Sequence, residues 1–189
     1  HIKIHDPESG AVFVNKRNAI HYENMSIALA ESVANQGQGF ISSMAFGNGG
    51  TSVDPTGIIT YLTPNSTGTN ASLYNQTFTK IVDDRSVSNL DPQRNKIETR
   101  HVNGTNYTDV VVTCLLDYGE PNGQDATDTA SASDSLYVFD ELGLVSYASS
   151  GTGKLLTHVI FHPVQKSLNR LIQIDYTVRV QSLTGFNEG

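Results

Sequence analysis

The sequence predicts a mainly β (α+β) domain: an antiparallel β-sandwich or barrel-like sheet with one N-terminal helix and an extended N-terminal arm. Three observations favour this class: many short apolar runs separated by Gly-, Asn- and Ser-rich turns, one strictly alternating run near the C-terminus, and one segment with helical periodicity. Strands and helices do not alternate along the chain, which argues against a doubly wound fold. The chain has 189 residues, so we expect a single domain over residues 18–189 behind an arm of residues 1–17.

The composition is that of a folded, acidic protein with few charges. Apolar residues make up 38% of the chain and charged residues only 16%, against about a quarter in an average domain. The formal net charge of −7 argues against nucleic acid or an anionic membrane as the main partner, because both require a basic face. The single cysteine, Cys114, lies within an apolar run, so we interpret it as a buried small hydrophobic residue.

Residues 1–17 are interpreted as the arm. Two short apolar runs lie on either side of a turn signal at 7–10. We expect these runs to pair with another strand or to reach onto a neighbouring subunit. The assembly residues are Ile2, Ile4, Val12, Phe13 and Val14.

Residues 19–35 are predicted to hold the helix. Asn18 or Asn24 is expected to cap its start, and Gly37 is expected to stop it in the left-handed conformation. Its apolar stripe follows the helical repeat and consists of Met25, Ala28, Leu29, Ser32 and Val33.

The other apolar runs predict about eight strands, and the polar stretches between them predict loops. The strands are expected at 40–46, 57–62, 78–82, 107–116, 136–139, 144–147, 155–161 and 172–181. The last strand alternates apolar and polar residues, which indicates one buried and one wet face. Loops are expected at 63–72, 84–95 and 118–134, the last of them long and exposed.

Two glycine-containing segments are predicted to be structural turns. The first contains Gly47, Asn48, Gly49 and Gly50 after a strand, and the second contains Glu141 and Gly143 between two strands. Gly and Asn tolerate the positive φ that a tight reversal requires. The first segment lacks the Lys-Ser/Thr ending of a phosphate loop, and no helix follows it. Acidic residues at such turns are expected to bind backbone N–H groups.

No catalytic, cofactor-binding or metal-binding residue is predicted. His158 and His162 have the spacing of a helical metal pair, but on a strand they would lie about 13 Å apart. Asp125 and Asp128 lie in the long loop without the calcium-loop pattern. The chain contains no nucleophile elbow, and its aromatic residues form no stripe with basic residues between them.

The order of five segments resembles the N-terminal module of tailed-bacteriophage tail-collar fibre proteins. The segments are residues 44–49, 73–80, 110–116, 139–144 and 155–161. Residues 162–170 are similar to small structural proteins of cyanophage-type and other aquatic phages. The resemblance implies a non-enzymatic virion structural protein of the tail, neck, baseplate or fibre attachment, assembled in the host cytoplasm. The partners implied are other virion proteins and copies of the chain itself, in a homo-oligomer.

Two other functions remain open at this point. A capsid decoration (cement) protein would also be acidic, β-rich and poor in cysteine, and would carry an extended arm. A carbohydrate-binding module is favoured by the eight tyrosines and the polar loops. A hydrolase whose residues are scattered along the chain leaves no local motif and is a further alternative.

Overall fold

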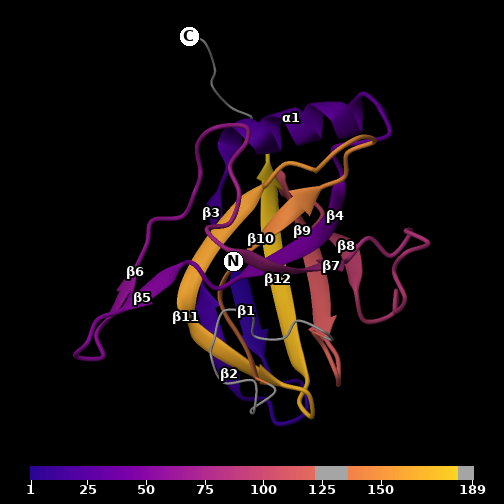
Figure 1. The fold of residues 1–189 in the computed structure, drawn as a ribbon. Helices are drawn as coiled ribbons and strands as arrows, with labels where there is room; N and C mark the ends of the chain where they lie inside the picture. The colour runs from indigo at the N-terminus through magenta and orange to yellow at the C-terminus, as the bar shows by residue number, and fades with distance from the viewer. Residues whose placement is uncertain (122–135, 183–189) are drawn as a thin grey trace.

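The structure, a computed structural model, is a two-layer β-sandwich with one helix at one end (Figure 1). It describes residues 1–121 and 136–182, so most of the loop predicted at 118–134, with Asp125 and Asp128, lies outside the described residues. The two large sheets are antiparallel and pack face to face without closing into a barrel. The predicted fold class is therefore confirmed in its sandwich form.

Each large sheet has five strands, and a separate two-stranded hairpin projects from the body. The first sheet has the order β2 (Val12–Lys16), β1 (Ile2–His5), β12 (Ile172–Gln181), β9 (Tyr107–Leu116) and β8 (Lys96–His101). The second has the order β3 (Ala19–Ile20), β11 (Thr157–Ser167), β10 (Leu136–Ser146), β4 (Ile41–Gly47) and β7 (Gln76–Ile81). The hairpin consists of β5 (Thr51–Val53) and β6 (Ile59–Tyr61), at the left of Figure 1.

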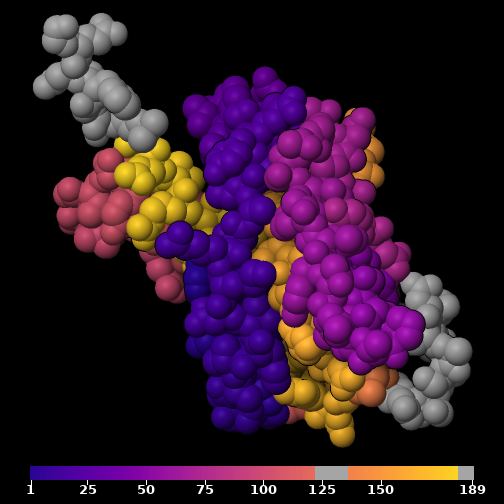
Figure 2. All heavy atoms as spheres, turned by 90° about the vertical axis from the view of Figure 1, so that its left-hand side faces the viewer, coloured from indigo at the N-terminus to yellow at the C-terminus, as the bar shows by residue number. Residues whose placement is uncertain are grey.

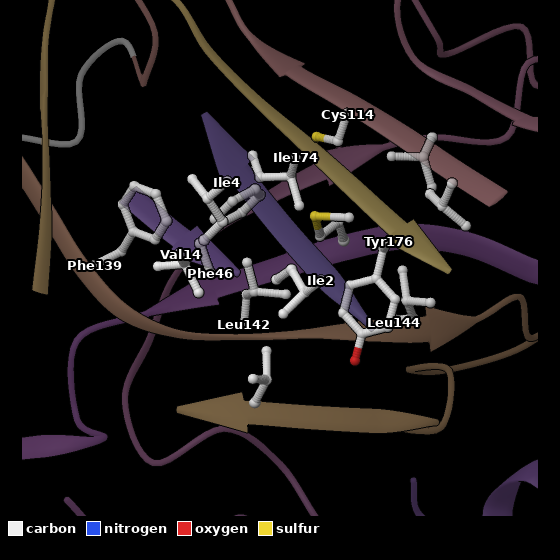
Figure 3. Packing of buried hydrophobic residues seen from close by; sticks show 14 of the residues in the cluster. Ile2, Ile4, Val14, Phe46, Cys114, Phe139, Leu142, Leu144, Ile174 and Tyr176 are labelled. Atoms are coloured by element: carbon white, nitrogen blue, oxygen red, sulfur yellow. The ribbon is translucent and has the colours of Figure 1, made fainter. Parts of the chain in front are cut away.

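The core lies between the two sheets and draws on strands from both ends of the chain. Figure 3 shows Ile4 and Ile174 of the first sheet facing Phe46, Phe139 and other residues of the second. In β12 the predicted alternation is present, because every second residue from Ile172 to Val178 is buried. Cys114 belongs to this core, and burial raises the pKa of its thiol to about 12.

Residues 1–17 are part of the sandwich instead of a free arm. The strand β1 pairs with β12 on one side and with β2 on the other, so it lies inside the first sheet. Ile2 and Ile4 are fully buried, whereas Val12 on β2 is half exposed. Of the two expectations for these runs, pairing with another strand is confirmed, and the partner is the C-terminal strand of the same chain. The division into an arm and a separate domain is corrected.

The helix α1 (Tyr22–Val33) lies across one end of the sandwich (Figure 1). It is capped by neither predicted asparagine, because His21 Nδ1 accepts the backbone N–H of Asn24 at 3.1 Å. The left-handed stop comes at Asn35, with φ of 53°, before Gly37. No helix in the described ranges 1–121 and 136–182 is long and apolar enough to cross a membrane.

The strand predicted at 155–161 extends further than expected and includes Pro163, a residue that usually ends a strand. The strand β11 continues to Ser167, and its register with β10 shifts between Phe139 and Glu141. Glu141 is opposite Ile160 while Phe139 is opposite Val164, so the proline falls in an irregular part of the ladder. A bulge of this kind is where a sheet tolerates proline.

Shortening the Ile4 side chain tests the corrected position of residues 1–17. We expect Ile4→Ala to lower the free energy of unfolding by about 2–5 kcal/mol, because it leaves a cavity between the sheets. Val12→Ala, on the exposed side of the same hairpin, is the matched control and should cost much less. Urea unfolding followed by circular dichroism measures both, and equal small losses would restore the free-arm interpretation.

Candidate functional site

Two of the five segments that carry the resemblance, residues 44–49 and 139–144, lie side by side in the second sheet. The strands β4 and β10 are antiparallel neighbours, with Gly47 opposite Glu141, Phe46 opposite Leu142 and Ala45 opposite Gly143. About ninety residues of sequence separate the two segments. Their side chains and backbone therefore form one local site, which we call the acidic junction and define by Asp140 and Glu141.

Glu141 is fully buried and binds four donors from three parts of the chain. Its Oε1 accepts the backbone N–H groups of Gly49 at 3.1 Å and Asn75 at 2.8 Å. Its Oε2 accepts the N–H of Tyr74 at 3.0 Å and His158 Nε2–H at 2.8 Å. Burial alone would raise the pKa of Glu141, but these four hydrogen bonds together lower it below the ordinary value.

Asp140 holds the neighbouring part of the same loop. Its Oδ1 accepts the Gly50 N–H at 2.9 Å, and its Oδ2 accepts the Thr51 N–H at 2.9 Å and also the Thr51 hydroxyl. Burial raises the pKa of this carboxyl, and the hydrogen bonds from Thr51 and Gly50 only partly oppose that effect. Leu62, just after β6, donates its N–H to the Gly50 carbonyl, so the loop that Asp140 binds is the base of the β5–β6 hairpin.

His158 is fixed in one tautomer by its two partners. The backbone N–H of Asn65 donates to Nδ1 at 2.7 Å, so this nitrogen carries no proton. Nε2 carries the proton and donates it to Glu141. The side chains of His158 and Glu141 are both fully inaccessible to solvent.

The acidic junction has the chemistry of a structural anchor. A general base requires a lone pair within reach of a substrate, but both ring nitrogens of His158 and all four carboxylate oxygens already have partners. His162 is exposed and its ring contacts the Tyr61 hydroxyl at 3.4 Å, so the two histidines bind different partners. Within residues 1–121 and 136–182, no group of three His, Cys, Asp or Glu side chains is placed to hold a metal ion.

The glycines of the two segments have a different role from the predicted one. Residues 136–146 form one continuous strand, so no turn exists at Glu141 and Gly143. The strands β4 and β5 belong to different sheets and do not pair with each other. None of Gly47, Gly49, Gly50 and Gly143 has a positive φ. Instead, a Cβ at Gly143 would lie 2.2 Å from the Thr157 carbonyl oxygen, and one at Gly47 would lie 2.4 Å from the Asn75 carbonyl oxygen.

Asn48 and the hydrogen bonds of the junction extend the contact to the 73–76 segment. The Asn75 side-chain amide donates to Asn48 Oδ1 at 2.6 Å, and the backbone N–H of Asn48 donates to the Asn75 carbonyl. Sequence reasoning expected acidic residues to bind backbone N–H groups but placed them in turns. It missed His158 and Tyr74, which no local pattern links to Glu141.

A second feature, which we call the helix groove, lies under α1. It is an open, mostly apolar cavity of about 530 Å³ between the helix, the end of the first sheet and the start of β4. The helix contributes four of the five residues of its predicted apolar stripe: Met25, Ala28, Leu29 and Ser32. Only Ala28 among these is buried, and Leu29 stays 41% exposed at the mouth. Arg85 and Asp83 lie at the rim, bound to each other.

Comparison of the chain with protein-family models, with curated proteins and with solved structures finds no match in any of the three.

Removing the charge of Glu141 tests the acidic junction. In Glu141→Gln one acceptor oxygen becomes an NH₂ donor that faces other donors. We expect a loss of unfolding free energy of about 1–3 kcal/mol or more. Glu98→Gln, at a partly exposed position on β8, is the control and should be nearly neutral.

The stability difference between wild type and Glu141→Gln is also expected to depend on pH. Because the pKa of Glu141 is lowered by folding, its contribution is fully present above about 4.3, the unfolded value, and is lost as the pH falls through the folded pKa. The stability difference between wild type and Glu141→Gln should therefore shrink as the solution is acidified below that value. A difference that stays constant with pH would contradict the assigned role.

Gly143→Ala tests whether glycine is required at this position because of the close approach of a neighbouring backbone and not because of a positive φ. The added methyl group meets a backbone carbonyl that cannot rotate away, so we expect a loss of about 1–3 kcal/mol or more. Gly104→Asn is the comparison, because Gly104 has φ of +85° and open space, so any loss there comes from backbone strain and not from close approach. If Gly143→Ala melts at the wild-type temperature, the close-approach argument fails.

Proposed function

We propose that this chain is a non-enzymatic structural protein of a bacteriophage particle, acting in the tail, neck, baseplate or fibre attachment. The observation that carries the proposal is the convergence of two of the five resembling segments, residues 44–49 and 139–144. They pair in register and are joined through Asp140 and Glu141 into one buried unit. The sequence resemblance to the tail-collar fibre module supplies the assignment to a virion.

The chemistry of the acidic junction supports assembly over catalysis. Its carboxylates are 0–3% exposed and saturated with hydrogen bonds, so substrate has no access to them. The two carboxylates hold the projecting β5–β6 hairpin and the loop at residues 74–75 in position, and both segments are surfaces for contact. A protein that works by contact requires rigid loops, and the junction provides that rigidity.

Cryo-electron microscopy of purified phage particles tests the proposal. We expect ordered density for the chain at symmetric contacts between other virion proteins of the tail or its attachment. If the density instead covers the capsid surface, with one copy at each repeat of the shell lattice, the chain is a capsid decoration protein. Absence from the particle would overturn the proposal.

A glycan array and an activity screen complete the test on the purified chain. The proposal expects neither specific glycan binding nor turnover. Turnover that disappears in a folded variant with one substituted His or Asp would contradict it.

A further inference from the structure

The β5–β6 hairpin projects from the body and exposes apolar side chains. Thr51 is paired with Tyr61 and Val53 with Ile59, so these four side chains share one face. Val53 is 62% exposed and Tyr61 50% exposed. Ser52 and Thr60 form the opposite, polar face. Figure 2 shows residues of this region, in purple and magenta, as a raised ridge beside the orange strand β11.

Two strands alone are marginally stable in water, so a projecting hairpin requires contacts that hold it in place. This hairpin is held rigidly at both ends. At the tip, Asp54 accepts the N–H groups of Thr56 at 2.8 Å and Ile58 at 2.9 Å. At the base, Asp140 binds Gly50 and Thr51. A rigid hairpin loses little conformational entropy on docking, which favours binding.

The helix groove is the complementary surface. Its floor is apolar, with Ile97, Val110 and Val178 from the first sheet, and its helix wall is half exposed. A cavity of about 150 Å³ holds one benzene ring, so 530 Å³ accommodates about three large side chains. Val53, Ile59 and Tyr61 are three such side chains on one face.

The hairpin and the groove lie toward opposite edges of the sandwich. The hairpin packs beside β11, next to the edge strand β3, whereas the groove reaches β8 and the segment after β7 at the other edge. In Figure 1 the hairpin projects to the left, and β7 and β8 lie to the right. One copy therefore cannot fill its own groove with its own hairpin, but a second copy can.

A small ligand fits the groove less well. Small-molecule sites combine an apolar lining with free polar groups that orient the ligand. At this rim Asp83 accepts from Arg85, and the Arg85 guanidinium also lies over the Phe40 ring at 5.8 Å. Asp83 and Arg85 are engaged within the chain, and the exposed Asp84 is the other charged residue of the lining. The open apolar floor favours another protein surface as the occupant.

We infer that copies of this chain associate head to tail, with the apolar face of the β5–β6 hairpin of one copy docked in the helix groove of the next. Such a contact is heterologous, and its repetition closes a ring or extends a filament. The inference deepens the proposed assembly role and rests on it for its biological setting. The contact itself is a property of the isolated chain.

Two sets of variants test the contact on the purified chain by multi-angle light scattering. The hairpin variant is Val53→Lys with Tyr61→Lys, and the groove variant is Leu29→Lys with Val180→Lys, all at positions at least 39% exposed. We expect wild type to form oligomers and each variant to associate at least about tenfold more weakly. Val12→Lys, at a half-exposed site outside both surfaces, is the control and should associate as wild type does.

Mixing the two variants decides the geometry. The hairpin variant retains an intact groove and the groove variant retains an intact hairpin, so a one-to-one mixture has one productive contact. We expect a heterodimer that grows no further. A monomeric wild type, a wild-type oligomer that survives either variant, or a mixture that forms no heterodimer would overturn the inference.

One further variant separates this hairpin from a competing surface. Val87 and Leu90, in the loop after β7, are 99% and 96% exposed. If Val87→Lys with Leu90→Lys abolishes association while the hairpin variant does not, the hairpin assignment is wrong. Because these experiments use the isolated chain, their failure would leave the particle-location test of the proposed function unaffected.

Discussion

The structure depends on the requirement that two buried carboxylates have every oxygen satisfied. Removing an ionised carboxyl from water costs several kcal/mol unless hydrogen bonds replace the lost solvation. Asp140 and Glu141 meet this requirement only when three segments are brought together: residues 49–51, residues 74–75 and His158. The burial of the two charges therefore makes the positions of these segments mutually dependent.

The strand geometry at this point explains how two consecutive residues, Asp140 and Glu141, can both bind the loop at 49–51. Neighbouring side chains of a regular strand point to opposite faces of the sheet. Between Phe139 and Glu141 the register with β11 shifts, and a bulge of this kind redirects a side chain. Asp140 and Glu141 can then bind adjacent N–H groups of the same stretch, Gly49 to Thr51. The close approach of β4 to the junction excludes any side chain at Gly47, which accounts for glycine there.

The elements with regular periodicity were predictable, and the contacts over long sequence distances were not. The bounds expected for the strands at 107–116 and 172–181 are those of β9 and β12, because a buried run and a strict alternation identify a strand directly. Residues 1–17 were expected to pair with a strand or with a neighbouring subunit, and their separation from the domain as an arm was wrong because Ile4 pairs with Ile174, a partner 170 residues away. The turn at Glu141 and Gly143 was wrong, and the positive φ expected at the glycines is absent, because a sequence does not distinguish a positive φ from a close backbone approach. The junction itself was only partly predictable, since Asp140 and Glu141 were expected to bind N–H groups but His158 had no local signal.

The position of α1 connects the fold to its surfaces. The helix has the apolar stripe that periodicity predicts, but it lies across the end of the sandwich, where the sheets cover only part of the stripe. Ala28 is buried, whereas Leu29 and Val33 are 41% and 87% exposed. A helix in a self-sufficient domain normally buries such a stripe against its own core. The uncovered half therefore favours a surface completed by another chain, and the proposed contact assigns the hairpin anchored by Asp140 to it.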